Sequence, residues 1–172
     1  MEMTTDRTGR RMQVFIGVFA VVFTIGTALH NFLIIDTAVI EQMMREAGGA
    51  DPAGDAPGFL SGFRVVGTVY IVANAVGIAA LWARPKWLYW WVLAVNATQG
   101  LGWVMIPTVM WSVVADRYGP LGILPSAVTD GGAVVVAIVM IAVLVRSRAV
   151  WGMARALIRL RFARARIASG HG

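Results

Sequence analysis

Cysteine is absent from the chain and histidine occurs only twice, which removes several kinds of chemistry. Without cysteine the chain has no disulfide, thiolate metal site, iron–sulfur cluster or catalytic thiol of its own. The two histidines are His30 and His171, and the second lies in the C-terminal tail, so we expect no haem held by two histidines of this chain. The sequence therefore predicts no cofactor and no metal site.

Charged residues are also scarce. They make up 14% of the 172 residues, whereas hydrophobic residues make up 58%. Soluble domains are typically about 25% charged and about 45–50% apolar. The formal net charge is +6, but the basic residues stand at the ends of apolar segments and in the C-terminal tail, which is typical of membrane topology. We therefore predict an all-α integral membrane protein that contacts the lipid bilayer and binds no nucleic acid.

Four apolar segments have the length of about 20 residues that a helix needs to cross a bilayer. The first is longer than the apolar core of about 7–15 residues in a signal peptide, and no Ala-x-Ala site follows it, so we expect it to be retained. The predicted spans are residues 12–35, 63–83, 88–110 and 125–145. They form a four-transmembrane-helix bundle, which makes residues 1–147 one membrane domain.

The first two spans are joined by a predicted outer loop over residues 36–62. Asp36 is in position to cap a short helix over residues 37–47, which carries its apolar side chains on one side and so suits the membrane interface. The stretch 48–58 follows with four glycines and two prolines. This composition predicts an irregular, mobile loop.

The other connections differ in length. Spans two and three are joined by Arg84-Pro85-Lys86, which is short enough to predict an antiparallel hairpin. Residues 112–124 are predicted to form a loop, and Pro125 suits the first turn of the fourth span, where its missing N–H would have no partner. Aromatic residues around the hairpin link predict an interfacial belt: Trp82, Trp87, Tyr89, Trp90 and Trp91.

Lysine and arginine are unevenly distributed between the two sides of the predicted bundle. One side has seven of them near the span ends (Arg7, Arg10, Arg11, Arg84, Lys86, Arg146 and Arg148), and the other side has three (Arg45, Arg64 and Arg117). Because basic residues are retained on the cytoplasmic side, this bias predicts that both termini are cytoplasmic. The predicted location is the bacterial inner (plasma) membrane, as a multi-pass protein.

Residues 148–172 are predicted to be a cytoplasmic, basic, amphipathic helical tail. At about 100° per residue, four arginines fall on one stripe: Arg148, Arg155, Arg159 and Arg166. Such a helix lies on the inner leaflet and binds anionic lipids. The alternative role is a docking surface for an acidic partner protein.

Polar side chains inside the spans need partners, because hydrocarbon offers none. His30, Asn31, Arg64 and Asp130 are predicted to lie in one outer layer of the bundle, and Gln99 lies deeper. One interpretation is structural: Arg64 and Asp130 form an ion pair, and the amides join helices. The other is an outward-facing polar pocket that binds a small molecule or passes a proton, with His30 as the titrating group.

The segment from Phe63-Arg64-Val65-Val66-Gly67 to Leu81, followed by a basic hairpin link, resembles the second span of DoxX-like small four-helix membrane proteins. In that group an arginine stands near the start of this span and a glycine soon follows, here Arg64 and Gly67, with Gly77 further on. The resemblance does not include the acidic segment 36–58. It implies a four-helix bundle and carries no catalytic residues.

Three functions are compatible with the sequence. The leading hypothesis is a small accessory or scaffold protein of the inner membrane, without enzymatic activity, in a larger membrane complex. The first alternative is a small-molecule binder or transporter with an outward-facing polar site, as a homo-oligomer because four short spans make a narrow bundle. The second is a membrane enzyme acting on a lipid or quinone, for which the sequence offers no nucleophile or acid–base pair beyond His30 and Asp130.

Overall fold

The computed structural model describes residues 2–147 and 150–152, with side chains from Arg7 onward. Every regular element in these ranges is helical. In chain order the elements are α1 (Glu2–Leu29), the π-helical turn η1 (His30–Ile34), α2 (Thr37–Glu46), α3 (Pro52–Gly77), the 3₁₀ turn η2 (Ile78–Leu81), α4 (Lys86–Met105), α5 (Thr108–Tyr118), α6 (Pro120–Ser126), the π-helical turn η3 (Ala127–Gly131), α7 (Gly132–Ser147) and the 3₁₀ turn η4 (Val150–Gly152).

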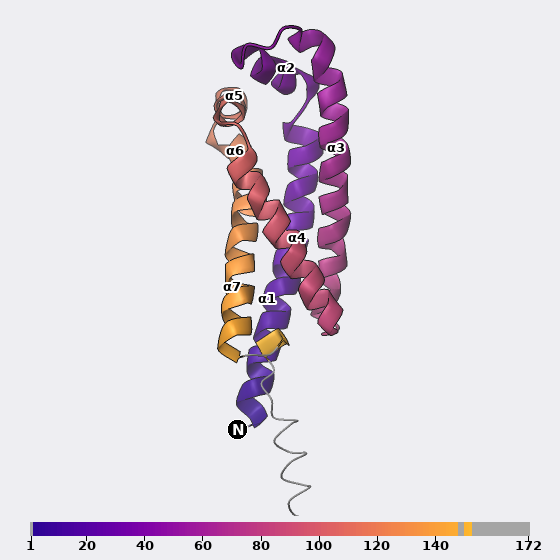
Figure 1. Cartoon of the computed structure of the whole chain (residues 1–172), viewed down its shortest axis with the longest axis vertical. Helices are drawn as coiled ribbons and strands as arrows, with labels where there is room; N and C mark the ends of the chain where they lie inside the picture. Colours follow the sequence, from indigo (N-terminus) through magenta and orange to yellow (C-terminus); the bar gives the residue numbers. More distant parts are fainter. Residues whose placement is uncertain (1, 148–149, 153–172) are drawn as a thin grey trace, which may run out of the picture.

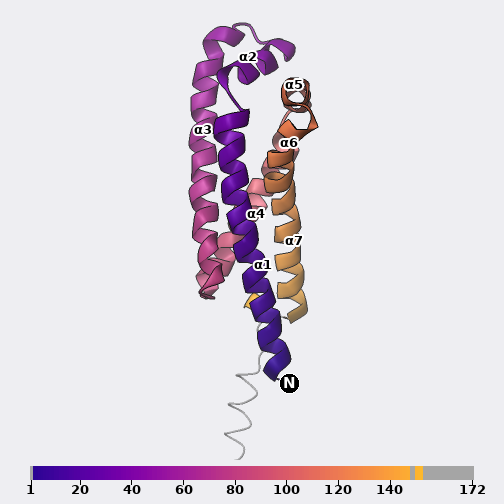
Figure 2. The ribbon, with the colours of Figure 1, turned by 180° about the vertical axis from the view of Figure 1, so that it is seen from behind.

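Three continuous helical segments are long and apolar enough to cross a membrane: Arg7–Ile34, Pro52–Leu81 and Pro120–Ser147. A fourth crossing is formed if α4 and α5, which meet at an angle of 84°, are one broken span. The helices α1, α3, α4 and α7 run along the long axis of the molecule (Figure 1), and from behind α1 lies between α3 and α7 (Figure 2). The predicted all-α membrane bundle is therefore confirmed.

The two ends of the bundle differ. One end, called here the cap end, carries α2 and α5, which lie across the ends of the long helices (Figure 1). The opposite, hairpin end carries the short link between η2 and α4. The apolar interior is divided accordingly. One cluster of buried residues, called here the bundle core, lies at the hairpin end and contains Met12, Ile16, Phe23, Ala80, Leu88, Tyr89, Val92, Ala133, Val136, Met140 and Trp151. The other, called the cap core, contains Ile35, Val39, Ile40, Met43, Ala56, Leu60, Met110, Val113 and Val114.

Exposed tryptophans mark the hairpin end. Trp82, Trp87 and Trp90 are all exposed there, as side chains at the depth of the lipid headgroups are. Tyr89, which was predicted to join them, is instead fully buried, and its hydroxyl donates a hydrogen bond to the carbonyl of Met140 at 2.6 Å. Tyr89 therefore joins α4 to α7 within the bundle core.

The predicted loop between the first two spans is largely helical. The short helix after Asp36 is confirmed as α2, and the Asp36 carboxylate caps it by accepting from the N–H of Val39 at 2.8 Å. The expectation of an irregular loop over 48–58 is wrong, because α3 already begins at Pro52. Asp51 caps α3 through the N–H of Gly54, and Pro52 occupies the first turn, where proline loses no hydrogen bond. The free energy gained by burying the start of α3 against α2 outweighs the low helix propensity of the glycines in this segment.

The predicted loop over 112–124 is also helical. It falls within α5 and α6, and the apolar residues Met110, Val113 and Val114 recur at helical spacing and pack into the cap core. The third span does not continue to residue 110: α4 ends at Met105, and the chain turns at Pro107, the N-cap of α5. The fourth span begins earlier than predicted, with Pro120 rather than Pro125 in its first turn.

The first part of the predicted tail that the structure describes is attached to the bundle. Trp151 is fully buried, its indole N–H donates to the carbonyl of Pro85 at 3.1 Å, and its ring meets that of Tyr89 edge-on at 5.4 Å. Four predicted membrane-surface arginines, Arg148, Arg155, Arg159 and Arg166, lie outside the described residues.

Candidate functional site

A cavity of about 160 Å³ lies between the long helices on the cap side of the bundle core. Four of the five residues predicted for the polar site line it: His30, Asn31, Gln99 and Asp130. Its wall is completed by Thr27, Phe63, Val66, Gly67, Tyr70, Thr98, Gly102 and Ile106. Segments far apart in the sequence, from α1 to η3, thus contribute to one cavity, whose surface is mostly apolar and carries a few polar groups. The fifth predicted residue, Arg64, lies outside this cavity.

The two ionisable residues of the cavity both stand in π-helical turns. His30 opens η1, in which the N–H of Ile35 donates to the carbonyl of His30 five residues back, at 3.1 Å. Asp130 lies in η3, which closes with the same kind of bond from Gly132 to Ala127. A π turn inserts one residue into an α-helix and so redirects the side chains around it, and such turns are frequent at functional sites. Sequence spacing alone does not reveal either turn.

Gln99 links three helices at the inner end of the cavity. Its side-chain oxygen accepts a hydrogen bond from the amide of Asn74 on α3 at 2.9 Å. Its amide nitrogen donates to the hydroxyl of Thr27 on α1 and to the carboxylate of Asp130, each at 3.2 Å. Gln99 is buried, and these three hydrogen bonds to neighbouring helices satisfy its side-chain amide, as a membrane interior requires.

Asp130 is held by neutral donors. Besides Gln99, its carboxylate accepts from the hydroxyl of Ser126 at 2.6 Å and from that of Thr129 at 3.4 Å. The predicted ion pair between Asp130 and Arg64 is wrong: within the described residues the ion pairs join Arg45 to Glu41 and Arg117 to Asp36. The donors from its own helix and from Gln99 take the place that an arginine was expected to fill.

Asn31, in η1, lies against α3. It is buried, and its amide nitrogen donates to the backbone carbonyl of Arg64 at 3.3 Å. A Cβ atom at Gly67 would lie 2.3 Å from the Asn31 side-chain oxygen, so a larger residue there would require the Asn31 amide to move. In the described part of the chain that oxygen has no hydrogen-bond partner. A buried, unpaired acceptor is costly, and here it belongs to a residue of the cavity wall.

The polar groups are spread along the long axis of the bundle. At 1.5 Å per residue, Asn74 lies about 12 Å from Trp82 along α3 and η2, and Arg64 lies about 27 Å from it. The hydrocarbon layer is about 30 Å thick, so with Trp82 at one interface we expect Arg64 near the headgroups at the cap end and the Asn74–Gln99 pair near the middle. Toward the hairpin end the interior is occupied by the bundle core. The cavity therefore lies on the cap side of the bundle core, and the next buried polar residue of α4 toward the hairpin end, Asn96, does not line it.

Three contributors were not singled out from the sequence. Thr27, Ser126 and Thr129 supply hydroxyls to the network, but threonine and serine are ordinary residues of membrane helices. Two of them had a positional signal: Thr27 precedes His30 by three residues and Ser126 precedes Asp130 by four, so each shares a helix face with an ionisable residue. Thr129, which directly precedes Asp130, had none.

Comparison with family models, curated proteins and solved structures finds no match for the chain. The resemblance of the Arg64–Gly67 segment to DoxX-like proteins therefore stays a prediction. The described residues contain no group of three or more His, Cys, Asp or Glu side chains that would hold a metal ion.

Proposed function

We propose that this small multi-span membrane protein binds a small polar molecule in the cavity formed by His30, Asn31, Gln99 and Asp130. The observation that carries the proposal is the convergence of these four side chains, from the three segments η1, α4 and η3, on one space of about 160 Å³. A cavity of about 150 Å³ accommodates a molecule the size of benzene. The ligand is therefore expected to have about six non-hydrogen atoms or fewer.

The composition of the wall supports binding rather than helix packing alone. Structural hydrogen bonds between membrane helices need one pair of groups each, whereas here two ionisable side chains and an unpaired amide oxygen share one wall. Both ionisable residues stand in π turns, and Ile106, also in the wall, lies at the break between α4 and α5. Irregular backbone at membrane depth is tolerated where it lines a cavity or is buried in protein.

Binding is favoured over passage through a single copy of the chain. Phe23, Leu88 and Met140 are fully buried in the bundle core between the cavity and the hairpin end, and Trp151 packs into the same core. A ligand that enters from the cap side meets no further polar group of the network beyond Asn74 and Gln99. Transport would require this core to open.

The cap end is proposed to face the periplasm, with both chain termini in the cytoplasm. The support is the bias of seven basic residues near the span ends on one side against three on the other. Reporter fusions at Gly172 and at Gly48, which is exposed in the turn between α2 and α3, should report opposite sides. A periplasmic signal from the Gly172 fusion would reverse the orientation.

The binding proposal is tested with four probes of suitable size and different charge: acetate, acetamide, ethylammonium and imidazole. Purified protein in detergent is heated with each probe, and Tm is measured. A probe present at a hundred times its Kd stabilises the folded state by about 2.7 kcal/mol, so at least one should raise Tm. The rise should disappear in Gln99→Leu and in Asp130→Asn.

Asn96→Leu is the matched control, because Asn96 is a buried amide on the same helix that bonds to the carbonyl of Val92 and does not line the cavity. This variant should keep the rise in Tm. The proposal is refuted if none of the four probes raises Tm, or if the rise survives in both cavity variants.

A further inference from the structure

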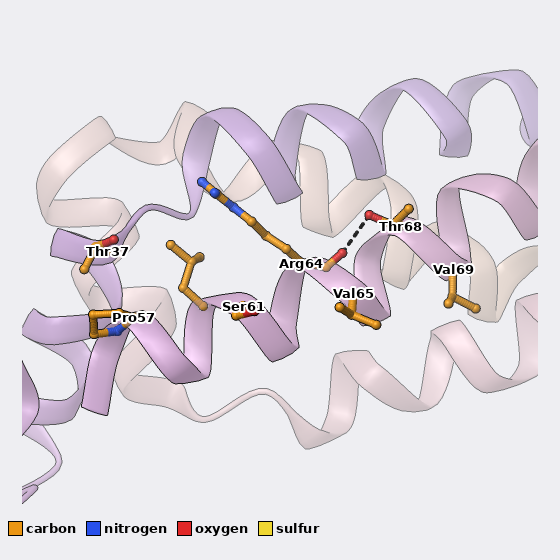
Figure 3. A pocket seen from close by; sticks show the side chains of 8 residues that line it. Thr37, Pro57, Ser61, Arg64, Val65, Thr68 and Val69 are labelled. Carbon is orange, nitrogen blue, oxygen red and sulfur yellow. Dashed lines mark hydrogen bonds between the residues drawn. The ribbon is translucent and has the colours of Figure 1, made fainter. Parts of the chain in front are cut away.

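A second, larger hollow opens on the surface of α3 at the cap end. This groove, whose lining side chains are drawn in Figure 3, measures about 520 Å³ and shares no lining residue with the cavity. Seven of its lining residues come from α3 and one from α2: Pro57, Leu60, Ser61, Arg64, Val65, Thr68, Val69 and Thr37. The α3 residues recur at spacings of three and four, so they form one face of the helix.

Arg64 is the charged residue of this groove. Its side chain is directed away from α3 toward the turn that precedes Thr37 (Figure 3). In the described part of the chain its guanidinium forms no ion pair. The hydroxyl of Thr68 and the amide of Asn31 both bond to the backbone carbonyl of Arg64, not to its side chain. The positive charge is thus available on an exposed face.

The depth of Arg64 decides which anion it meets. It lies about 27 Å from the exposed Trp82 at the hairpin end, which is close to the full thickness of the hydrocarbon layer. A guanidinium at that depth is at the level of the lipid phosphates. Asp36, beside Thr37, does not compensate the charge, because its carboxylate is paired with Arg117 at 3.0 Å. Phosphate and guanidinium form charge-assisted, frequently bidentate hydrogen bonds.

Along its length the groove changes from polar to apolar side chains, as a lipid changes from headgroup to acyl chain. Ser61 and Arg64 stand at its cap-end half, and toward the membrane middle the same face continues with Val65, Val69 and Val72, all of which are well exposed. A headgroup followed by an acyl chain has the same order of polar and apolar parts. Neither a soluble anion nor an uncharged hydrocarbon would use both halves.

We propose that this groove is a phospholipid-binding site, in which Arg64 binds the phosphate and one acyl chain lies along Val65, Val69 and Val72. The Ser61 hydroxyl is placed to donate a further hydrogen bond to the phosphate. The site does not depend on the cavity proposed above, since Arg64 does not line that cavity. The two proposals can therefore fail independently.

The test measures lipid binding to the full-length protein in detergent by native mass spectrometry. Dioleoylphosphatidylethanolamine is the probe, because it has no net charge and so limits attraction to the basic C-terminal tail. Dioleoylglycerol has the same chains without phosphate, and glycerol 3-phosphate has the phosphate without chains. Wild-type protein should retain one phosphatidylethanolamine molecule more tightly than either fragment. Arg64→Gln should weaken that binding about tenfold or more, since hydrogen bonds to charged groups are the stronger ones.

Two further variants make the result decisive. Arg64→Lys keeps the charge and should retain part of the affinity. Arg45→Gln, at an exposed cap-end arginine whose partner Glu41 does not line the groove, should leave the affinity unchanged. The proposal is overturned if dioleoylglycerol binds as well as the phospholipid, if glycerol 3-phosphate alone binds as tightly, or if Arg64→Gln binds like wild type. Unchanged Tm and elution volume of Arg64→Gln would show that any loss reflects the site and not misfolding.

Discussion

Replacing Gly67 with alanine should separate α1 from α3. The added Cβ would lie 2.3 Å from the side-chain oxygen of Asn31 and 2.4 Å from its Cγ, far inside van der Waals contact. To make room, the Asn31 amide must leave the backbone carbonyl of Arg64, to which it donates at 3.3 Å, or the two helices must move apart. Overpacking of this kind costs about 1–3 kcal/mol. Thermal unfolding in detergent, followed by tryptophan fluorescence, should show a lower Tm.

Gly62→Ala is the matched control. Gly62 is in the same helix and exposed, and a Cβ there would meet no atom within 4 Å. Both variants gain whatever alanine contributes to helix stability, so the difference between them isolates the contact with Asn31. In an Asn31→Ala background the cost of Gly67→Ala should fall toward zero, because the clashing amide is gone. If Gly67→Ala is as stable as Gly62→Ala, the close approach of α1 and α3 is refuted.

Two further predictions concern the interior. The side-chain amides of Asn74 and Gln99 form a hydrogen bond of 2.9 Å. In a double-mutant cycle of unfolding free energies, Asn74→Leu and Gln99→Leu should therefore show a coupling energy of about 0.6 kcal/mol, and at most about 1.7 kcal/mol. Additive effects of the two substitutions would contradict this hydrogen bond. Trp151→Ala should cost about 3–5 kcal/mol of unfolding free energy, since a fully buried indole is removed. Trp82→Ala, at a tryptophan that is 77% exposed, should change it by less than about 0.5 kcal/mol, and equal losses would contradict the docking of Trp151.

The depth of a residue in the membrane was not sufficient to predict the partner of Asp130. Equal depth placed Arg64 and Asp130 in one layer, and Arg64 does approach this layer through its backbone, which accepts from Asn31. Depth does not give the direction of a side chain around the helix axis. The Arg64 side chain turns to the outer face of α3, whereas Asp130 turns inward to Gln99 and Ser126.

The sequence by itself determined the membrane class, the apolar spans and most of the polar layer. Hydropathy is a local property of the chain, and the cost of burying His30, Asn31, Gln99 and Asp130 in hydrocarbon holds for any arrangement of the helices. This is why four of the five predicted site residues meet in one cavity.

Only the tertiary structure decided how these residues are joined and where the helices end. The helical starts of α3 and α5 depend on the cap core, whose contacts outweigh the loop-forming tendency of glycine and proline. The π turns of His30 and Asp130 widen the backbone by one residue, and Gln99 reaches both Asn74 and Asp130 only when α3, α4 and η3 are packed together. These features arise from contacts between segments that are distant in sequence, and such contacts cannot be predicted from local composition.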